Sequence, residues 1–210
     1  MDGVLWCFLF SSLSSPLSLI CTTVVEALFY IALAKPLVKD YNSRMDKNIV
    51  RNEFPPVFDL RSKVLILGSL PSVASRAVGF YYMNPRNRFW QMLSSLLSVD
   101  FIELPREGKI AALLEHGVAL SDVILACEIY RSADASIENV EYTDVPAILQ
   151  KSDIKAIFLN GQKAYDLFLR RYPEYATIAT RLPSTSPANA KSSLPSLIKA
   201  WGDAILPFLQ

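Results

Sequence analysis

The chain has 210 residues, a length that favours one domain, and its 21 Lys and Arg against 20 Asp and Glu give a formal net charge of +1. This balance excludes a global positive field for nucleic acid, so a DNA partner would require local positive charge. His116 is the single histidine, which excludes a zinc site with several histidine ligands and any Ser-His-Asp triad that does not use it. Only Cys127 lies beyond residue 21, so a disulfide framework is excluded there and a reducing cytoplasm is favoured.

Residues 1–44 form a hydrophobic N-terminal extension, in which only Glu26 interrupts the apolar run over residues 4–35 with charge. A signal peptide is disfavoured because no basic residue precedes the run. Residues 17–34 are long enough for a membrane anchor, and the basic residues after them would then keep the rest of the chain in the cytoplasm. We prefer a mis-assigned start or a leader without a part in the chemistry, which leaves residues 45–210 as one cytoplasmic domain.

The remainder of the chain alternates between short apolar runs and amphipathic stretches. Strands are expected over residues 63–69, 117–124 and 154–161, with a weaker fourth strand that begins at residue 177. Amphipathic spacing predicts helices over residues 87–98, 105–115, 162–172 and 191–209. This alternation is typical of an α/β domain with a mainly parallel sheet, in which ligands bind beyond the carboxyl ends of the strands.

The loop after the first strand contains three adjacent aromatic residues, Phe80, Tyr81 and Tyr82. Each of them alone is typical of a side chain that caps the core. Together they also fit a platform on which a flat ring stacks, because three neighbours in a loop cannot all point inward. We therefore expect at least one of them to face a pocket.

Polar and basic residues follow the aromatic ones. Asn87 precedes an amphipathic helix, and its spacing alone favours an N-cap. Several basic residues fall in or beside the loops at the expected ligand end, and they would supply the local positive charge that DNA requires: Arg76, Arg86, Arg88, Arg181 and Lys191.

The segment from Gly68 to Trp90, GSLPSVASRAVGFYYMNPRNRFW, resembles the first motif region of the hypoxanthine-DNA glycosylases, a branch of the uracil-DNA glycosylase superfamily. The family pattern combines a GS-x-P-S/G start with YY-x-x-P-x-N-x-FW. Four further segments match the family in the same order: GVALSDVI from Gly117, SADASI from Ser132, FLNGQKA from Phe158 and LPSTSPAN from Leu182.

The resemblance implies a three-layer α/β/α sandwich around a central four-stranded, mainly parallel sheet. It implies hydrolysis of an N-glycosidic bond in DNA without a metal or a cofactor. Related mismatch-directed enzymes have an Asn where this chain has Leu70, and Asn87 is expected to replace it by positioning the attacking water. Ser121 stands where many relatives have Trp.

The resemblance also assigns the binding residues. The substrate would be bound by residues of the first motif and by the asparagine that ends the third strand: Gly68, Ser69, Pro71, Ser72, Phe80, Tyr81, Tyr82 and Asn160. Backbone contacts to DNA would come from two arginines and from the second motif: Arg86, Arg88, Ser184, Thr185, Ser186, Asn189 and Lys191.

Three functions stay open from the sequence. The first is release of a deaminated base, hypoxanthine, from DNA by a monomer that needs no protein partner. The second is release of uracil from mismatched or single-stranded DNA. The third is a DNA-binding relative that has kept the fold without catalysis. Beside these three, a membrane-anchored α/β domain of another function would rest on residues 17–34 alone.

Overall fold

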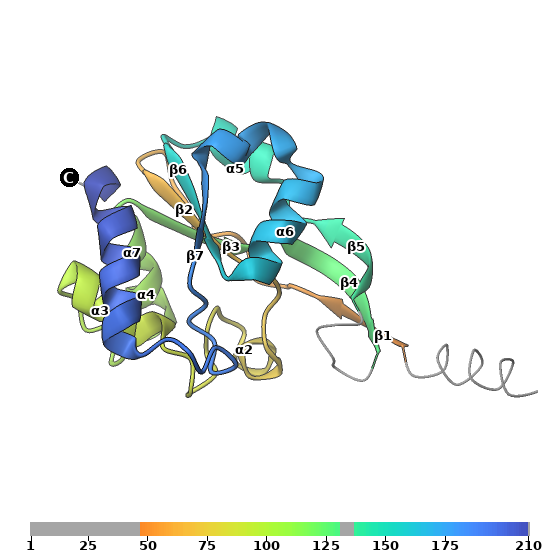
Figure 1. The fold of residues 1–210 in the computed structure, drawn as a ribbon, viewed down its shortest axis with the longest axis horizontal. Coiled ribbons are helices and arrows are strands. Elements are labelled where there is room, and N and C mark those ends of the chain that lie inside the picture. Colours follow the sequence, from red (N-terminus) through yellow and green to blue (C-terminus); the bar gives the residue numbers. More distant parts are fainter. Residues whose placement is uncertain (1–46, 131–136, 210) are drawn as a thin grey trace, which may run out of the picture. The chain divides into compact units, whose positions relative to one another are not determined.

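A computed structural model describes residues 47–130 and 137–209 of the chain (Figure 1). The chain divides into two compact units, Met1–Asn48 with Tyr130–Ser132, and Ile49–Ile129 with Ala133–Gln210. The first unit lies almost entirely outside the described residues, as do the predicted extension, its candidate anchor over residues 17–34, and most of the SADASI segment. The second unit contains the sheets and helices that position the candidate site.

Four parallel strands form the main sheet, in the order β3-β2-β6-β7. The strands are β2 (Val64–Gly68), β3 (Val118–Asp122), β6 (Ala156–Asn160) and β7 (Ala179–Leu182). Each overlaps a strand predicted from an apolar run, and the predicted α/β class is confirmed. The central strands β2 and β6 are buried because both of their faces are covered, as expected for parallel strands with continuous apolar sequences.

Helices cover both faces of the main sheet (Figure 1). On one face, alternate strand residues such as Val64 and Ile66 pack against α3 (Phe89–Leu97), α4 (Arg106–Glu115) and α7 (Leu194–Leu209). On the other face, Leu65 and Leu67 pack against α5 (Val145–Gln150) and α6 (Gln162–Arg171). This arrangement is the predicted three-layer sandwich.

The four predicted helices are present with bounds shifted by a few residues, and α6 buries Ala164, Leu167 and Phe168 as its spacing predicts. Three further short elements were not predicted: the helices α2 (Val73–Val78) and α5, and the 3₁₀ helix η2 (Pro173–Ile178). The Ser72 side chain caps α2 by accepting a hydrogen bond from the Ser75 main chain, and Gly79 ends it in the left-handed region at φ 77°.

A second, three-stranded sheet lies in the order β1-β4-β5. Its strands are β1 (Lys47–Arg51), β4 (Ile124–Tyr130) and β5 (Glu138–Tyr142), and β4 begins two residues after β3 ends. The sequence analysis predicted one strand over residues 117–124, whereas the structure has β3 up to Asp122 and a separate strand, β4, from Ile124. The main-chain N–H groups of Val123 and Ile124 donate to the carbonyls of Gly68 and Ser69, which couples the start of β4 to the end of β2.

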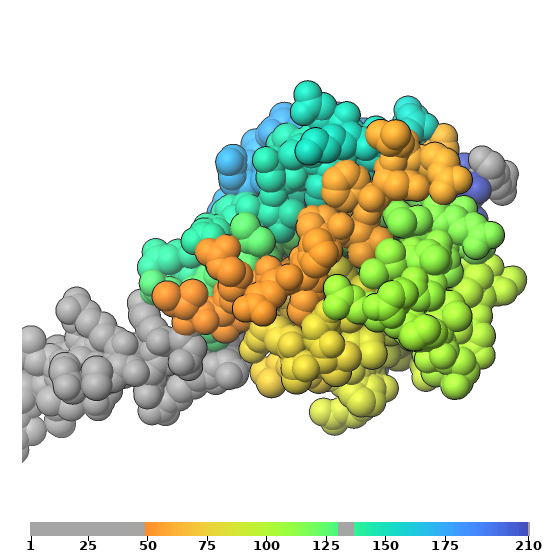
Figure 2. All heavy atoms as spheres, turned by 180° about the vertical axis from the view of Figure 1, so that it is seen from behind, coloured from red at the N-terminus to blue at the C-terminus, as the bar shows by residue number. Residues whose placement is uncertain are grey.

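Figure 2 shows the reverse face of the molecule, on which the segment before β2, in orange, runs between the green surface of residues near α4 and the teal surface of β5 and α5. Part of this segment, Phe54 to Phe58, borders a small pocket with Phe80 and Arg106. Within residues 47–130 and 137–209, no helix is both long and apolar enough to cross a membrane.

Candidate active site at the carboxyl ends of the strands

Because the strands are parallel, three of them end at the same edge of the main sheet, each with a small or polar residue. Gly68 at the end of β2 pairs with Asp122 at the end of β3, and Asn160 ends β6 on the other side of β2. The loops that leave these strands contain both motif regions found in the sequence. This edge is where ligands of open parallel sheets bind, and it contains the predicted substrate residues.

Two of the three adjacent aromatic residues belong to the core. Phe80 and Tyr81 are 2% and 1% exposed. Phe80 stacks on Trp90 with ring centroids 5.7 Å apart, whereas Tyr81 contacts Phe54 edge-on at 5.1 Å. The prediction that Phe80 and Tyr81 stack on the substrate is therefore corrected, because their rings already pack against other core aromatics.

Tyr82 is the aromatic residue that lies at the edge of the core. Its ring stacks on Phe89 at 3.9 Å, and its backbone adopts φ 57°, a conformation that aromatic residues rarely take. Its Oη is buried and, among described residues, has no hydrogen-bond partner. Burial and the nearby Asp122 carboxylate raise the pKa of Tyr82, so the phenol is neutral and keeps its O–H donor.

Asp122 is a buried carboxyl that the sequence analysis did not select. It is 3% exposed, and burial raises its pKa to about 7. A Cβ added at Gly68 would lie 2.1 Å from Asp122 Oδ1 and 2.9 Å from Tyr82 Oη, so only glycine leaves room for these two groups. A signal was present in GVALSDVI, where one acidic residue closes an otherwise apolar strand.

Asn87 lies directly before α3 and is partly buried. Its Oδ1 accepts a hydrogen bond of 3.0 Å from the Phe89 main chain, but the N-cap of α3 is Arg88, so the cap predicted at Asn87 is wrong by one residue. The bond to Phe89 uses one of the two lone pairs of the amide oxygen and holds the side chain in one orientation. A second lone pair is left for a water molecule.

The side-chain amide of Asn160 is hydrogen-bonded to Thr185 through both its nitrogen and its oxygen. Asn160 Nδ2 donates to Thr185 Oγ1 at 2.9 Å, and the Thr185 main chain donates to Asn160 Oδ1 at 2.9 Å. Thr185 is fully buried. These two bonds hold the second-motif loop, residues 183–193, and they leave one N–H and one lone pair of the Asn160 amide unused. The predicted roles of Asn160 in base reading and of Thr185 in phosphate contact stay predictions.

Arg88 also holds this loop through hydrogen bonds. Its guanidinium donates to four main-chain carbonyls, at 3.3 Å to Thr185, 2.7 Å to Ser186, 3.0 Å to Asn189 and also to Ser192. The Arg88 main chain donates to Thr185 O as well, at 3.1 Å. With four of its five donors used in this way, Arg88 joins the start of α3 to the second-motif loop. Its predicted contact to phosphate stays a prediction.

The second-motif loop has further internal bonds. Asn189 Nδ2 donates to Ser184 O at 2.8 Å and to Ser192 Oγ at 3.0 Å, so this predicted DNA ligand also holds the loop. Gly161, at φ 98°, lies against it, and a Cβ there would approach Ser184 Cβ to 2.8 Å. Ser184 and Ser186 remain partly exposed, whereas Arg86 and Lys191 are exposed on the two loops.

The first-motif loop begins with the predicted residues Ser69, Pro71 and Ser72. Ser69 is partly exposed beside Leu70, whereas Pro71 is buried and its carbonyl accepts a hydrogen bond of 2.7 Å from Arg76. Ser75 Oγ accepts from the Met83 main chain at 3.1 Å, which ties α2 to the second half of the loop. Thus Arg76 also stabilises the loop.

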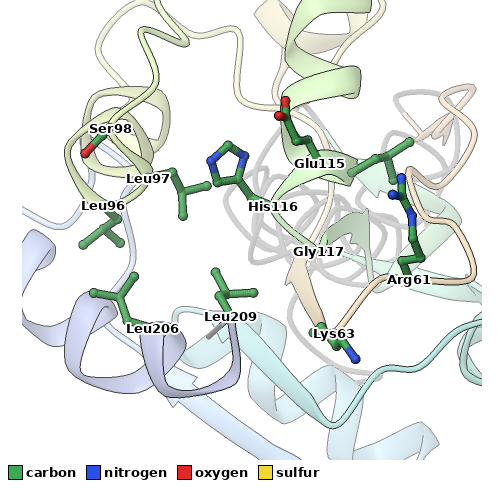
Figure 3. Close-up of a pocket in the computed structure, with 11 residues that line it drawn as sticks. Arg61, Lys63, Leu96, Leu97, Ser98, Glu115, His116, Gly117, Leu206 and Leu209 are labelled. Atoms are coloured by element: carbon green, nitrogen blue, oxygen red, sulfur yellow. The ribbon is translucent and has the colours of Figure 1, made fainter.

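A larger pocket lies at the opposite end of the sheet (Figure 3). It is next to Lys63 and Gly117, which precede β2 and β3, and its wall includes Leu97 and Leu206. The His116 ring points into this pocket, and its Nδ1 lies 2.8 Å from Ala112 O. Neither motif loop contributes to it, so the pocket is separate from the candidate site.

The residues that the structure describes include no group of three or more His, Cys, Asp and Glu side chains placed to hold a metal ion. The chemical groups at the strand ends are instead a neutral phenol, a buried carboxyl, and amides. These groups can orient water and hydrogen-bond to a polar ring, in keeping with a hydrolytic site.

A protein-family model matches nearly all of the sandwich. Residues 55–205 match the model of the uracil DNA glycosylase superfamily. The chain belongs to this superfamily. A glycosylase from Methanosarcina barkeri, named hypoxanthine DNA glycosylase, is 32% identical over 154 residues, which cover 72% of this chain and 95% of the relative.

Two further glycosylase relatives come from Methanosarcina acetivorans. A protein named hypoxanthine DNA glycosylase is 32% identical over 148 residues, covering 69% of this chain and 92% of the relative. A solution NMR structure described as a candidate uracil DNA glycosylase superposes with a TM-score of 0.64 at 29% identity, and covers 74% of this chain and 98% of that structure. The sandwich is thus the fold of this glycosylase superfamily.

Proposed function

We propose that this superfamily member is a monofunctional DNA glycosylase that releases a deaminated base, hypoxanthine, from DNA. The observation that carries the proposal is the edge of the sheet at which Gly68, Asp122 and Asn160 end neighbouring strands, next to a loop held by Asn160 and Arg88. Similarity to two relatives named hypoxanthine DNA glycosylase supports the choice of base.

Base release begins with extrusion of the damaged nucleotide, because the glycosidic bond inside a duplex cannot be reached. Extrusion costs roughly a few kcal/mol, and less for a base that pairs poorly. Bond cleavage then places positive charge on the sugar and negative charge on the departing base. Asn87 is the residue that orients water toward the anomeric carbon, through the lone pair that its bond to Phe89 leaves free.

The two motif loops divide the contacts to DNA. Arg86 and Lys191 supply positive charge to phosphates, and Ser184 and Ser186 supply hydroxyl or amide groups. Arg88, Asn160, Thr185 and Asn189 hold the loop that presents them. Gly68 and Ser69 form the wall against which the base lies, together with Tyr82.

The deciding experiment uses duplex oligonucleotides that carry one deoxyinosine or one deoxyuridine, with alkaline cleavage of the abasic product. We expect strand cleavage with deoxyinosine at a rate well above that with deoxyuridine. Faster cleavage at deoxyuridine would instead identify a uracil DNA glycosylase, the activity in the description of the similar NMR structure. Binding of either duplex without base release would refute enzymatic function.

We also propose that the enzyme acts as a cytoplasmic monomer without a protein partner or a cofactor. The sequence supports this, because one domain contains both motif loops and a single cysteine lies beyond residue 21, as is usual in a reducing compartment. Sedimentation of the purified full-length chain alone and with DNA tests the stoichiometry. A dimer in the DNA complex would contradict it.

A further inference from the structure

A tight turn over residues 84–87 presents the Asn87 side chain shortly before α3. The Asn87 main chain donates to Asn84 O at 2.8 Å, which closes a four-residue β-turn. The sequence NPRN suits this turn, because proline at the second position fixes φ and asparagine is favoured at the first. The main chain that carries the proposed water-orienting amide is therefore fixed on its N-terminal side.

The Asn84 side chain adds a second hydrogen bond within the turn. Its Oδ1 accepts from the Arg86 main chain at 3.0 Å, which is the arrangement of an Asx turn. No described residue accepts a hydrogen bond from Asn84 Nδ2, so within the protein this amide supports the turn through its oxygen alone. The side chain is partly buried, in keeping with this local role.

Ser75, in α2, holds the residue that precedes the turn. Its Oγ accepts from the Met83 main chain at 3.1 Å and lies 3.0 Å from Ser72 Oγ. Its carbonyl accepts from the main chains of Gly79 and Phe80, at 2.9 and 3.1 Å. Ser75 is 1% exposed, so one small buried residue binds the first-motif loop at three points.

The bond between Ser75 and Met83 fixes the peptide that follows a left-handed residue, Tyr82. At φ 57° the Tyr82 backbone adopts a conformation that persists only where its surroundings hold it. The Tyr82 ring is held by stacking on Phe89, whereas the next peptide is held by the Ser75 hydroxyl. Loss of this bond would let the backbone relax and would shift the turn that carries Asn87.

We propose that Ser75 and Asn84 are positioning residues for Asn87, which fix the direction of its side-chain amide before DNA binds. The proposal rests on the glycosylase function proposed above, in which this amide orients the attacking water. An amide does not titrate, so its effect on that water depends on its position. The bond from the Phe89 main chain to Asn87 Oδ1 holds the amide from the α3 side, and the turn holds it from the loop side.

The first test measures single-turnover base release from deoxyinosine duplex at saturating full-length enzyme. Asn84→Ala should lower the rate constant by about tenfold, because small displacements of a positioned group are costly. Asn84→Asp should restore the rate constant to within about twofold of the wild type, since its carboxylate accepts the same bond from the Arg86 main chain. Its negative charge should instead weaken the binding of DNA.

Equal rate constants for the wild type and Asn84→Ala would overturn the role of Asn84. An Asn84→Asp variant as slow as Asn84→Ala would also overturn it, because aspartate lacks only the N–H donor. That result would show that Asn84 acts through its Nδ2 on the substrate and not through the turn.

The second test compares two serines that make the same kind of bond. Ser94 Oγ accepts from the Phe101 main chain at 3.0 Å, as Ser75 Oγ does from Met83, but Phe101 follows the carboxyl end of α3 whereas Asn87 precedes its start. Ser75→Ala and Ser94→Ala should both lower the melting temperature, because each leaves a main-chain N–H without its acceptor. Only Ser75→Ala should slow base release, by about tenfold.

Equal slowing by both serine variants would overturn the role of Ser75, because loss of stability alone would then explain the rate. A wild-type rate in Ser75→Ala would overturn it as well. If Ser75→Ala does not fold, the variants of the partly exposed Asn84 decide the proposal. Absence of base release by the wild type would overturn the glycosylase function itself, whereas unchanged variants of an active enzyme would overturn only the positioning roles.

Discussion

The two motif loops meet at one edge of the sheet, but they are held in different ways. Aromatic packing holds the first, with Phe80 on Trp90 and Tyr82 on Phe89. Hydrogen bonds from side chains to the main chain hold the second, chiefly from Arg88. Ser75 and Arg76 add hydrogen bonds to the first loop, but its exposed Arg86 makes none with its guanidinium among the described residues. Arg86 and Arg88, two residues apart, are therefore assigned different roles.

The largest effect is expected at Asn87, where the first loop presents a polar group to the substrate. Asn87→Ala should lower single-turnover base release by at least about 100-fold, because the attacking water loses its orientation. Loss of the bond to the Phe89 main chain should also reduce the free energy of unfolding by about 1 kcal/mol. Asn87→Ser is the matched control, since serine restores an oxygen that can accept from this main-chain N–H. Stability should recover in that variant while release stays low, and recovery of both would refute the catalytic role.

Arg88→Ala should have the next largest effect, because it removes the charged tie of the second loop. We expect a loss of about 2–3 kcal/mol in the free energy of unfolding, and base release slower by about tenfold or more. The salt dependence of DNA binding should stay as in the wild type. A reduced salt slope would show that Arg88 contacts phosphate after all. Arg88→Lys should rescue little, because an ammonium cannot reproduce the planar fork.

Thr185→Val removes one bond of the second loop with almost no change in side-chain volume. Asn160 Nδ2 would lose its acceptor at 2.9 Å. Leaving this donor unsatisfied should reduce the free energy of unfolding by about 1–3 kcal/mol, measured by chemical denaturation. Ser186→Ala, at a partly exposed position of the same loop, should cost less, because water can replace the bond that its Oγ accepts from the Ala188 main chain at 3.2 Å. Equal effects of the two changes would contradict the difference between a buried and a partly exposed hydroxyl.

Arg86→Ala should give the smallest change and the sharpest contrast with its neighbour Arg88. Arg86 is exposed, so its loss should not affect stability. DNA binding should weaken similarly for all sequences, and the slope of log K against log salt should decrease in magnitude by about 1. Fluorescence anisotropy over a salt series measures this slope. A slope equal to that of the wild type would exclude a phosphate contact.

The sequence predicted the main sheet and its helices because continuous apolar runs and helical spacing report burial directly. The runs VLIL and AIFL became central strands. The second sheet was missed although its strand β4 begins with the apolar run ILAC, because the start of that run was assigned to the strand predicted over residues 117–124. β5 reads ENVEY and is largely exposed, so neither composition nor alternation distinguishes it from a loop.

Residue roles at the site were harder to predict, because they depend on partners that are distant in the sequence. Asn160 is hydrogen-bonded to a residue 25 positions away, and Arg88 to carbonyls about 100 positions away. Asp122 becomes notable only when Gly68 and Tyr82 are placed beside it. Motif matching thus located the site, whereas the division into contacting and positioning residues required the structure.

Gly161 has a consequence for which sequences this site tolerates. Its φ of 98° already disfavours other residues, and a Cβ there would meet Ser184 Cβ at 2.8 Å. Gly79 is also left-handed, at φ 77°, but nothing lies within 4 Å of its added Cβ. Saturation mutagenesis should therefore accept Asn or Asp at residue 79 and only glycine at residue 161. Gly161, which lies against the second-motif loop, is thus expected to tolerate fewer substitutions than Gly79.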